Sequence, residues 1–125
     1  MNELSGLRIL VAEDETIVSL MIEDLLLDAG ATVVGPAPSV RSAMDLLLFQ
    51  AVDGAVLDFN LGGEMIVPVA DALTSRQIPF VILTGYGPAR VNTHYPKATV
   101  LNKPIDVQNF AGAVFRSFRA AAAQP

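Results

Sequence analysis

Polar side chains that could serve phosphate chemistry follow four short apolar runs of this chain. In chain order these side chains are Glu13 and Asp14, then Asp58, then Thr84, and finally Lys103. A short apolar run bounded by turn residues predicts a strand buried on both faces, as in parallel sheets covered by helices. Ligands of such sheets gather at the carboxyl ends of the strands. We therefore expect three carboxylates, a hydroxyl and an ammonium group to meet at one edge of a sheet.

This set of groups could hold a divalent cation and transfer a phosphoryl group. Mg²⁺ prefers about six oxygen ligands, of which one or two come from carboxylates. Asp14 and Asp58 could supply these carboxylates, with Glu13 acting through a water molecule. An aspartate such as Asp58 can also attack phosphorus and carry the phosphoryl group as an acyl phosphate. Lys103 would then offset charge on the phosphoryl oxygens, and Thr84 would donate its hydroxyl to one of them.

Each of these residues also has an ordinary structural interpretation. An acidic pair such as Glu13 and Asp14 commonly caps the N-terminus of a helix. A single Asp at a strand end commonly forms a turn, a threonine hydroxyl commonly caps a helix, and a single lysine is commonly solvated. Four such positions at the strand ends of one sheet favour a shared site over four separate explanations.

Strands and helices that would position these groups alternate along the chain. Apolar runs predict strands at residues 8–12, 32–34, 54–58, 79–83 and 99–102. Apolar residues at helical spacing predict helices at residues 14–28, after an N-cap at Ser39, at residues 65–75 with Pro68 in the first turn, and at residues 107–121. Gly and Pro interrupt residues 85–98, so a fourth helix there should be short or irregular. Alternating units with short links predict an α/β doubly wound sheet with helices on both faces.

The first and last helices carry the apolar residues that matter most for packing. The buried stripe of the first helix is expected to consist of Val18, Met21, Ile22 and Leu25. Ile17 and Leu20 lie on its flanks, where a solvated helix would carry polar side chains. The last helix is expected to begin with a buried Val107.

Composition excludes several classes of protein. The chain has 125 residues and no cysteine, which suits one domain without disulfides or thiolate metal sites. Its formal net charge of -5 and only 8 basic residues argue against nucleic-acid binding. The sequence contains no apolar stretch of the ~20 residues that a membrane span needs, and its start lacks the basic flank of a signal peptide, so we expect a cytoplasmic protein. The hydrophobic share of 52% is compatible with an interface, including one between two copies of the chain.

Along essentially its whole length, the chain resembles the receiver domain of two-component response regulators. The resemblance rests on the acidic pair Glu13 and Asp14, on Asp58, on Thr84 after the fourth strand, and on the pair Lys103 and Pro104. It implies a flavodoxin-like fold with five parallel strands in the order 2-1-3-4-5. It also implies that residues 1–125 form a single receiver domain with no output domain. The run at residues 84–86 resembles a subgroup of mostly single-domain receivers with a Thr-Gly-Tyr motif, known in alphaproteobacterial signalling.

The resemblance implies Mg²⁺-dependent uptake of a phosphoryl group onto Asp58 from a histidine kinase or a histidine phosphotransfer protein. Signalling would follow through protein contacts that depend on phosphorylation. The implied metal-binding residues are Glu13, Asp14, Asp58 and, through its main-chain carbonyl, Asn60. Thr84 and Lys103 would contact the phosphoryl group, and the peptide bond between Lys103 and Pro104 is usually cis in this family. The domain would catalyse only its own phosphoryl transfer and autodephosphorylation, so an enzyme with an external substrate is not expected.

Two features depart from the family pattern. The segment between Thr84 and Lys103 is too short and too broken for the ordinary fourth helix, and one position of the fifth strand differs. Val100 stands three residues before Lys103, where the family usually has the aromatic residue whose rotamer the threonine gates. Three other functions remain open. A phosphatase-like enzyme could use Asp58 as nucleophile, but it would need an acid or base two residues further on, and Asn60 is neither. A pseudo-receiver could act as a scaffold, or a receiver could act as a phosphate sink without its own output.

Overall fold

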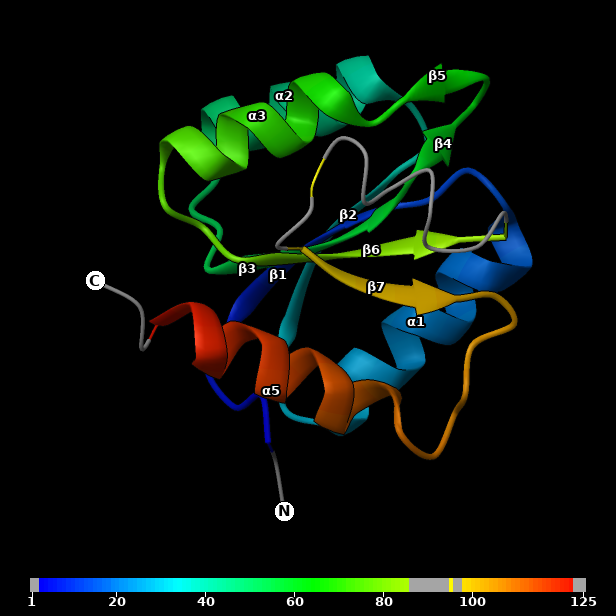
Figure 1. Cartoon of the computed structure of the whole chain (residues 1–125), viewed down its shortest axis with the longest axis vertical. Coiled ribbons are helices and arrows are strands. Elements are labelled where there is room, and N and C mark those ends of the chain that lie inside the picture. Colours follow the sequence, from blue (N-terminus) through cyan, green and yellow to red (C-terminus); the bar gives the residue numbers. More distant parts are fainter. Residues whose placement is uncertain (1–2, 86–94, 96–97, 123–125) are drawn as a thin grey trace.

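A parallel sheet forms the centre of the computed structural model, which describes residues 3–85, 95 and 98–122 (Figure 1). Five strands make up this sheet, in the order β2-β1-β3-β6-β7. They are β1 Arg8–Ala12, β2 Thr32–Ala37, β3 Gly54–Asp58, β6 Phe80–Thr84 and β7 Thr99–Asn102. All neighbouring strands in the sheet run parallel. The predicted doubly wound, flavodoxin-like order is confirmed, since β6 and β7 are the fourth and fifth strands of the sheet.

Helices cover both faces of the sheet. The helices α2 Val40–Phe49 and α3 Val67–Ser75 lie on one face, and α1 Thr16–Asp28 and α5 Phe110–Ala122 lie on the other (Figure 1). The expected short or irregular fourth helix falls on a segment that lies largely outside the described residues. Every helix in the described part of the chain is too short or too polar to cross a bilayer.

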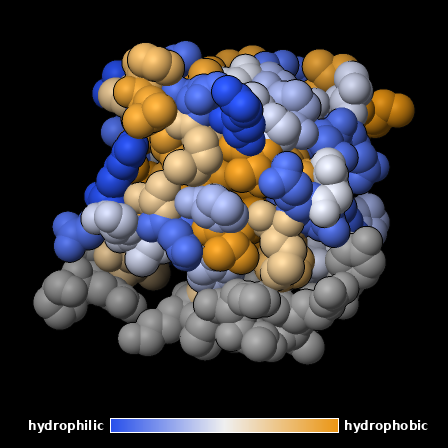
Figure 2. Space-filling model, turned by 90° about the horizontal axis from the view of Figure 1, so that it is seen from above, coloured by the Kyte–Doolittle hydropathy of each residue, from blue (hydrophilic) through white to orange (hydrophobic). Residues whose placement is uncertain are grey.

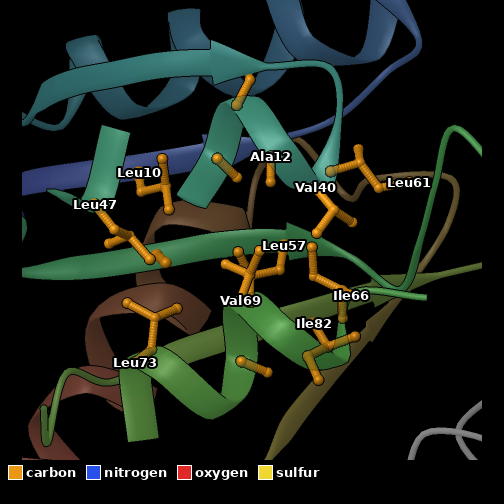
Figure 3. Close-up of a cluster of buried hydrophobic side chains, with 14 of the residues drawn as sticks. Leu10, Ala12, Val40, Leu47, Leu57, Leu61, Ile66, Val69, Leu73 and Ile82 are labelled. Atoms are coloured by element: carbon orange, nitrogen blue, oxygen red, sulfur yellow. The ribbon is translucent and has the colours of Figure 1, made fainter. Parts of the chain in front are cut away.

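Side chains alternate between the two faces of each strand and build two hydrophobic layers. Leu10, Leu57 and Ile82 point toward α2 and α3, where they meet side chains such as Val69 and Leu73 (Figure 3). Their sequence neighbours on the strands, which include Ile9, Val11, Val56 and Val81, pack with α1 and α5 on the other face. Both layers consist of closely packed buried side chains, so the sheet is held from two sides and its strand ends are fixed relative to one another.

The second helix begins as the sequence predicts. Ser39 Oγ accepts a hydrogen bond from the Ser42 amide at 3.0 Å, and Ser42 Oγ accepts one from the Ser39 amide at 3.1 Å. Each side chain thus satisfies an amide that the first turn leaves without an intrahelical partner.

The first helix differs from the prediction in both its start and its buried face. It begins at Thr16, two residues late, because the Glu13 carboxylate accepts a hydrogen bond from the Glu15 amide and holds residues 13–15 in a turn. The buried residues are Ser19, Ile22 and Leu26, whereas Met21 is exposed. The apolar stripe is therefore rotated by about one position, and the prediction that Met21 is buried is wrong.

A short hairpin replaces the expected start of the third helix. β4 Asn60–Leu61 pairs antiparallel with β5 Glu64–Met65. Met65, which was predicted to be helical, therefore lies in a strand. The turn between the strands uses Gly62 and Gly63 with φ of 59° and 87°, a conformation that glycine adopts without a side-chain clash. α3 then begins at Val67, and Pro68 lies in its first turn as predicted.

The second strand continues past its predicted end. It runs through Gly35 and Pro36 to Ala37, with a shift of register against β1 between Leu10 and Ala12. β2 is an edge strand, and a proline is tolerated there because its missing amide would face away from the sheet. The prediction failed because it took Pro36 as a stop without knowing that the strand lies at the edge.

The last helix begins later than predicted, and Val107 is exposed rather than buried. The Asp106 side chain accepts hydrogen bonds from the Gln108 amide at 3.2 Å and from Asn109 Nδ2 at 2.7 Å. These bonds form a local turn that competes with helical hydrogen bonding until Phe110. The wrong boundary comes from reading Val107 as part of the apolar stripe.

Gly54 is a position in the sheet where the packing of α5 leaves no room for a side chain. A Cβ atom there would come within 2.5 Å of Phe118 Cζ in α5. We expect Gly54→Ala to lower the free energy of unfolding by about 1–3 kcal/mol, because the buried ring must shift. Urea denaturation measures this loss.

The matched control is Gly85→Ala, since a Cβ at Gly85 has no described atom within 4 Å. Its effect on the free energy of unfolding should be smaller. The loss caused by Gly54→Ala should also shrink in a Phe118→Leu background. A loss of equal size in both backgrounds would contradict the steric explanation.

Candidate functional site

The carboxyl ends of β1, β3, β6 and β7 bring the predicted site residues to one edge of the sheet (Figure 1). Asp58 and Thr84 are the last residues of β3 and β6, whereas Glu13 and Lys103 directly follow β1 and β7. Backbone bonds continue the strand pairing at this edge. The Glu13 amide donates to Ala37 O at 3.0 Å, and the Lys103 amide donates to Thr84 O at 2.9 Å. The sheet itself therefore sets the positions of these side chains.

Lys103 follows β7, the outer strand of the sheet, and its side chain reaches Asp58 at the end of the central strand β3. Its Nζ lies 3.1 Å from Asp58 Oδ2, 3.2 Å from Glu13 Oε1 and 3.1 Å from Glu15 Oε1. The bond between Lys103 and Pro104 is cis, as the resemblance implies. One ammonium group thus bridges three carboxylates that come from the ends of two strands and from the turn before α1.

Two of these carboxylates are buried. Asp58 and Glu13 are almost fully shielded from solvent, and Thr84 is buried beside them. Burial raises the pKa of Glu13 to about 7; the charge of Asp58 adds to this rise, and hydrogen bonds from the Glu15 amide and from Lys103 oppose it. Burial would lower the pKa of Lys103, but hydrogen bonds to Glu15 and Asp58 outweigh it and raise that pKa above its usual range. The ammonium group therefore stays charged at neutral pH.

The site also has the donor set of a divalent-cation site. Glu13, Asp14 and Asp58 each offer an oxygen, and these oxygens lie within 4.8 Å of one another. Oε1 of Glu13 is buried and accepts no hydrogen bond from the described residues, although it lies 3.2 Å from the charged Nζ of Lys103. Carboxylate oxygens are the ligands that Mg²⁺ prefers, so these residues fit such an ion. Asp14 is exposed, which leaves room for water among the ligands.

Asn60 lies beside Asp58, where the β4–β5 hairpin starts. Its amide donates to Asp58 Oδ1 at 3.3 Å, and its side-chain oxygen accepts a hydrogen bond from the Gly63 amide at 3.1 Å. The side-chain amide is thus occupied within the hairpin. Asn60 is placed at the site by its backbone rather than by its side chain.

Glu15 is a site residue that sequence reasoning missed. It stands at the N-cap of α1, yet its side chain makes no capping hydrogen bond and contacts Lys103 instead. A signal was available, because Glu15 continues the acidic run of Glu13 and Asp14. Its contact with a lysine 88 positions away, however, depends on the fold.

Val100, which stands at the usual position of the family's aromatic residue, packs against the hydrophobic layer under α2 and α3. An aromatic residue contacts the same layer from elsewhere in the chain. The Tyr95 ring meets Phe80 edge-on with ring centroids 6.1 Å apart, and its hydroxyl donates to Asp71 Oδ1 at 3.4 Å or to Val67 O at the same distance. Tyr95 therefore ties the chain before β7 to α3.

Known proteins resemble this chain in sequence and structure, although no family model matches it. SdrG from Sphingomonas melonis is 35% identical, with a TM-score of 0.78 over 98% of this chain and 100% of that one. A response regulator receiver protein from Sinorhizobium medicae is 27% identical, with a TM-score of 0.80 over 94% of this chain and 98% of that one.

The chain belongs to the receiver domains of response regulators. This receiver also matches the transcriptional regulatory protein PdtaR from Mycobacterium tuberculosis, with 28% identity over 80 residues. The match covers 63% of the receiver and 39% of PdtaR, so it concerns only part of that longer protein. The comparisons thus identify a signalling module of two-component systems.

The raised pKa of Glu13 predicts that the Mg²⁺-free receiver loses stability as pH rises. Unfolded, this carboxyl has a pKa of 4.5, and folded its pKa is about 7. Below both values the proton is bound in both states, and between them only the folded state keeps it. The free energy of unfolding should therefore fall by about 1–3 kcal/mol as pH rises through this range.

Denaturation in the presence of EDTA across this pH range measures the change. Glu13→Gln carries no titrating group, so its stability should lack this decline. Parallel profiles for the wild type and Glu13→Gln would contradict the assignment of the raised pKa to Glu13.

Proposed function

We propose that this receiver accepts a phosphoryl group on Asp58 and signals through protein contacts that depend on its phosphorylation. The observation that carries the proposal is the convergence of one ammonium group and several carboxylates on Asp58, with Lys103 Nζ at 3.1 Å. Phosphoryl transfer asks mainly for positioning and for charges that offset those of the phosphoryl oxygens. This edge of the sheet offers both.

Asp58 is the proposed nucleophile. One of its oxygens forms a bond to phosphorus while the bond from phosphorus to a donor histidine nitrogen breaks. That nitrogen keeps the electron pair and leaves as a neutral imidazole when its ring is protonated. The product is an acyl phosphate on Asp58, which water can later hydrolyse.

The surrounding residues would divide the remaining tasks. Glu13, Asp14, Asp58 and the main-chain carbonyl of Asn60 would hold Mg²⁺. A bound Mg²⁺ supplies positive charge next to the phosphoryl oxygens. Lys103 would donate a hydrogen bond to one phosphoryl oxygen, and Thr84 would donate its hydroxyl to another. Asp58 and Thr84 end β3 and β6, which are neighbours in the sheet, and this placement supports the assignment.

A phosphatase acting on small phosphate esters is a weaker candidate. Such an enzyme needs a general acid or base beside the nucleophile. Asn60, two residues beyond Asp58, cannot serve, and its side-chain oxygen already accepts the Gly63 amide. A pseudo-receiver scaffold is also disfavoured, because it would not need a lysine held beside a buried aspartate.

The proposed phosphodonor is a histidine kinase or a histidine phosphotransfer protein, which we expect to dock on α1. This helix begins at the site, since its N-cap residue Glu15 contacts Lys103. Ile17 and Leu20 on α1 are 78% and 53% exposed. Apolar side chains exposed next to a reaction site favour contact with a partner.

Asp58→Asn should abolish phosphorylation, because the amide cannot attack phosphorus as a carboxylate does. Incubation with acetyl phosphate and Mg²⁺, followed by intact-mass measurement, should show one added phosphoryl group on the wild type. Asp45→Asn, an exposed position on α2, is the matched control and should be labelled normally. EDTA should suppress labelling of the wild type. Phosphate found on the Asp58→Asn variant at the same site would refute the proposal.

Replacing Ile17 and Leu20 together with Ser should slow phosphotransfer from the cognate donor protein about tenfold or more, because two apolar contacts are lost at the interface. Labelling by acetyl phosphate should stay nearly unchanged, since that small donor needs no docking surface. Radiolabelled transfer from the phosphorylated donor measures the rate.

The control replaces two other exposed apolar residues, Leu48 and Phe49 at the end of α2, with Ser. Figure 2 looks onto the α2 and α3 side and shows apolar residues, in orange, exposed on that face. The α2 variant should receive phosphate at the wild-type rate from both donors. An equal loss with both donors in the α1 variant would mean that α1 positions the site rather than docks a partner.

A further inference from the structure

The ammonium group of Lys103 has as many carboxylate partners as it has protons. Its Nζ donates hydrogen bonds to Asp58 Oδ2 at 3.1 Å, to Glu15 Oε1 at 3.1 Å and, at the longer distance of 3.5 Å, to Glu13 Oε2. A hydrogen bond from Lys103 to a phosphoryl oxygen therefore requires that one of the present contacts be given up or shared. The strength of the interaction between Lys103 and the phosphoryl group depends on which of the three carboxylate contacts is lost.

The three partners differ in how firmly they are held. Glu13 is buried, and its Oε2 accepts the Glu15 amide at 3.1 Å. Asp58 is buried at the end of the central strand β3. The Glu15 side chain, by contrast, is 62% exposed at the rim of the site. Glu15 is thus the partner whose charge solvent and salt can screen.

The position of Glu15 gives a second indication of its role. The side chains that ordinarily cap a helix N-terminus are the short ones of Ser, Thr, Asp and Asn, and Glu15 is not among them. Glu15 makes no capping hydrogen bond, and its carboxylate is directed to Lys103 instead. Its backbone still serves the helix, because Glu15 O accepts the Ser19 amide at 2.9 Å.

We propose that Glu15 is a positioning residue which holds Lys103 at the rim of the site and competes with the incoming phosphoryl group for its ammonium charge. The proposal rests on the proposed function of Asp58. A third carboxylate next to the lysine also repels an anionic phosphodonor, and this repulsion acts in the same direction. Glu15 therefore slows phosphorylation of the receiver and lowers its affinity for phosphoryl analogues.

Glu15→Gln tests the competition because the amide keeps the size of the side chain and removes its charge. At saturating Mg²⁺ and low salt, this variant should be labelled by acetyl phosphate about two- to fivefold faster than the wild type, as suits a partly exposed ion pair. It should also bind beryllofluoride more tightly by a similar factor. The difference should close at about 1 M salt, where exposed charges are screened.

The matched control is Glu23→Gln, which makes the same change two turns further along α1, about 12 Å away along the helix axis. It should leave the labelling rate unchanged. A readout that does not depend on phosphorylation is the ¹⁵Nζ signal of Lys103, which should shift in Glu15→Gln and not in Glu23→Gln.

Each outcome decides between the proposals. A wild type that is labelled, together with a Glu15→Gln variant that is no faster, overturns the role of Glu15 alone. An unshifted Lys103 signal, or a rate difference that persists at high salt, overturns it as well. A wild type that takes up no phosphate overturns the proposed function, and the competition falls with it.

Discussion

The site depends on one ammonium group among three carboxylates. Glu13, Glu15 and Asp58 all lie within 3.2 Å of Lys103 Nζ. Without a cation at this edge, like charges at such spacing would repel one another, and one of them would take up a proton. The raised pKa of Glu13 shows that a single ammonium group does not fully offset the burial of its carboxylate. The same imbalance leaves a place for a second positive charge.

The packed sheet keeps these charged groups close together despite their repulsion. The strands that lead to the site residues are covered on both faces. The amides of Glu13 and Lys103 continue the backbone pairing just beyond the ends of β1 and β7. Asp58 and Lys103 would separate if the strands could slide past one another, and the two packed layers prevent this. The site residues therefore lie at strand ends and in the turns that follow them, whereas the buried residues that stabilise the fold lie outside the site.

Sequence reasoning found the parts of the fold that depend on continuous patterns. The run at residues 54–58 predicts β3 with its observed bounds, because a strand buried on both faces needs an unbroken apolar run. Helix starts were missed where local side-chain bonds decide them. The Glu13 bond to the Glu15 amide delays α1, and the Asp106 turn delays α5 past Val107. The β4–β5 hairpin was missed because Met65 alone does not distinguish a strand from a helix.

In the candidate site, chain order and residue type were enough to predict which residues meet, since strand ends share one edge. They were not enough for Glu15. Its partner is far away in sequence, and a charged residue at a helix start has an ordinary explanation in capping. Only the direction of its side chain, away from the helix and toward Lys103, distinguishes the two roles.

The interrupted path of β2 has a consequence for how this chain behaves at high concentration. Edge strands present unpaired amides and carbonyls, on which further strands can assemble into aggregates. In β2, Pro36 removes one of these amides, and the register shifts between Leu10 and Ala12 of β1. A chain in which 52% of residues are hydrophobic would otherwise offer a long, flat template for assembly. The proline and the register shift therefore make this edge of the sheet a poorer template for a further strand.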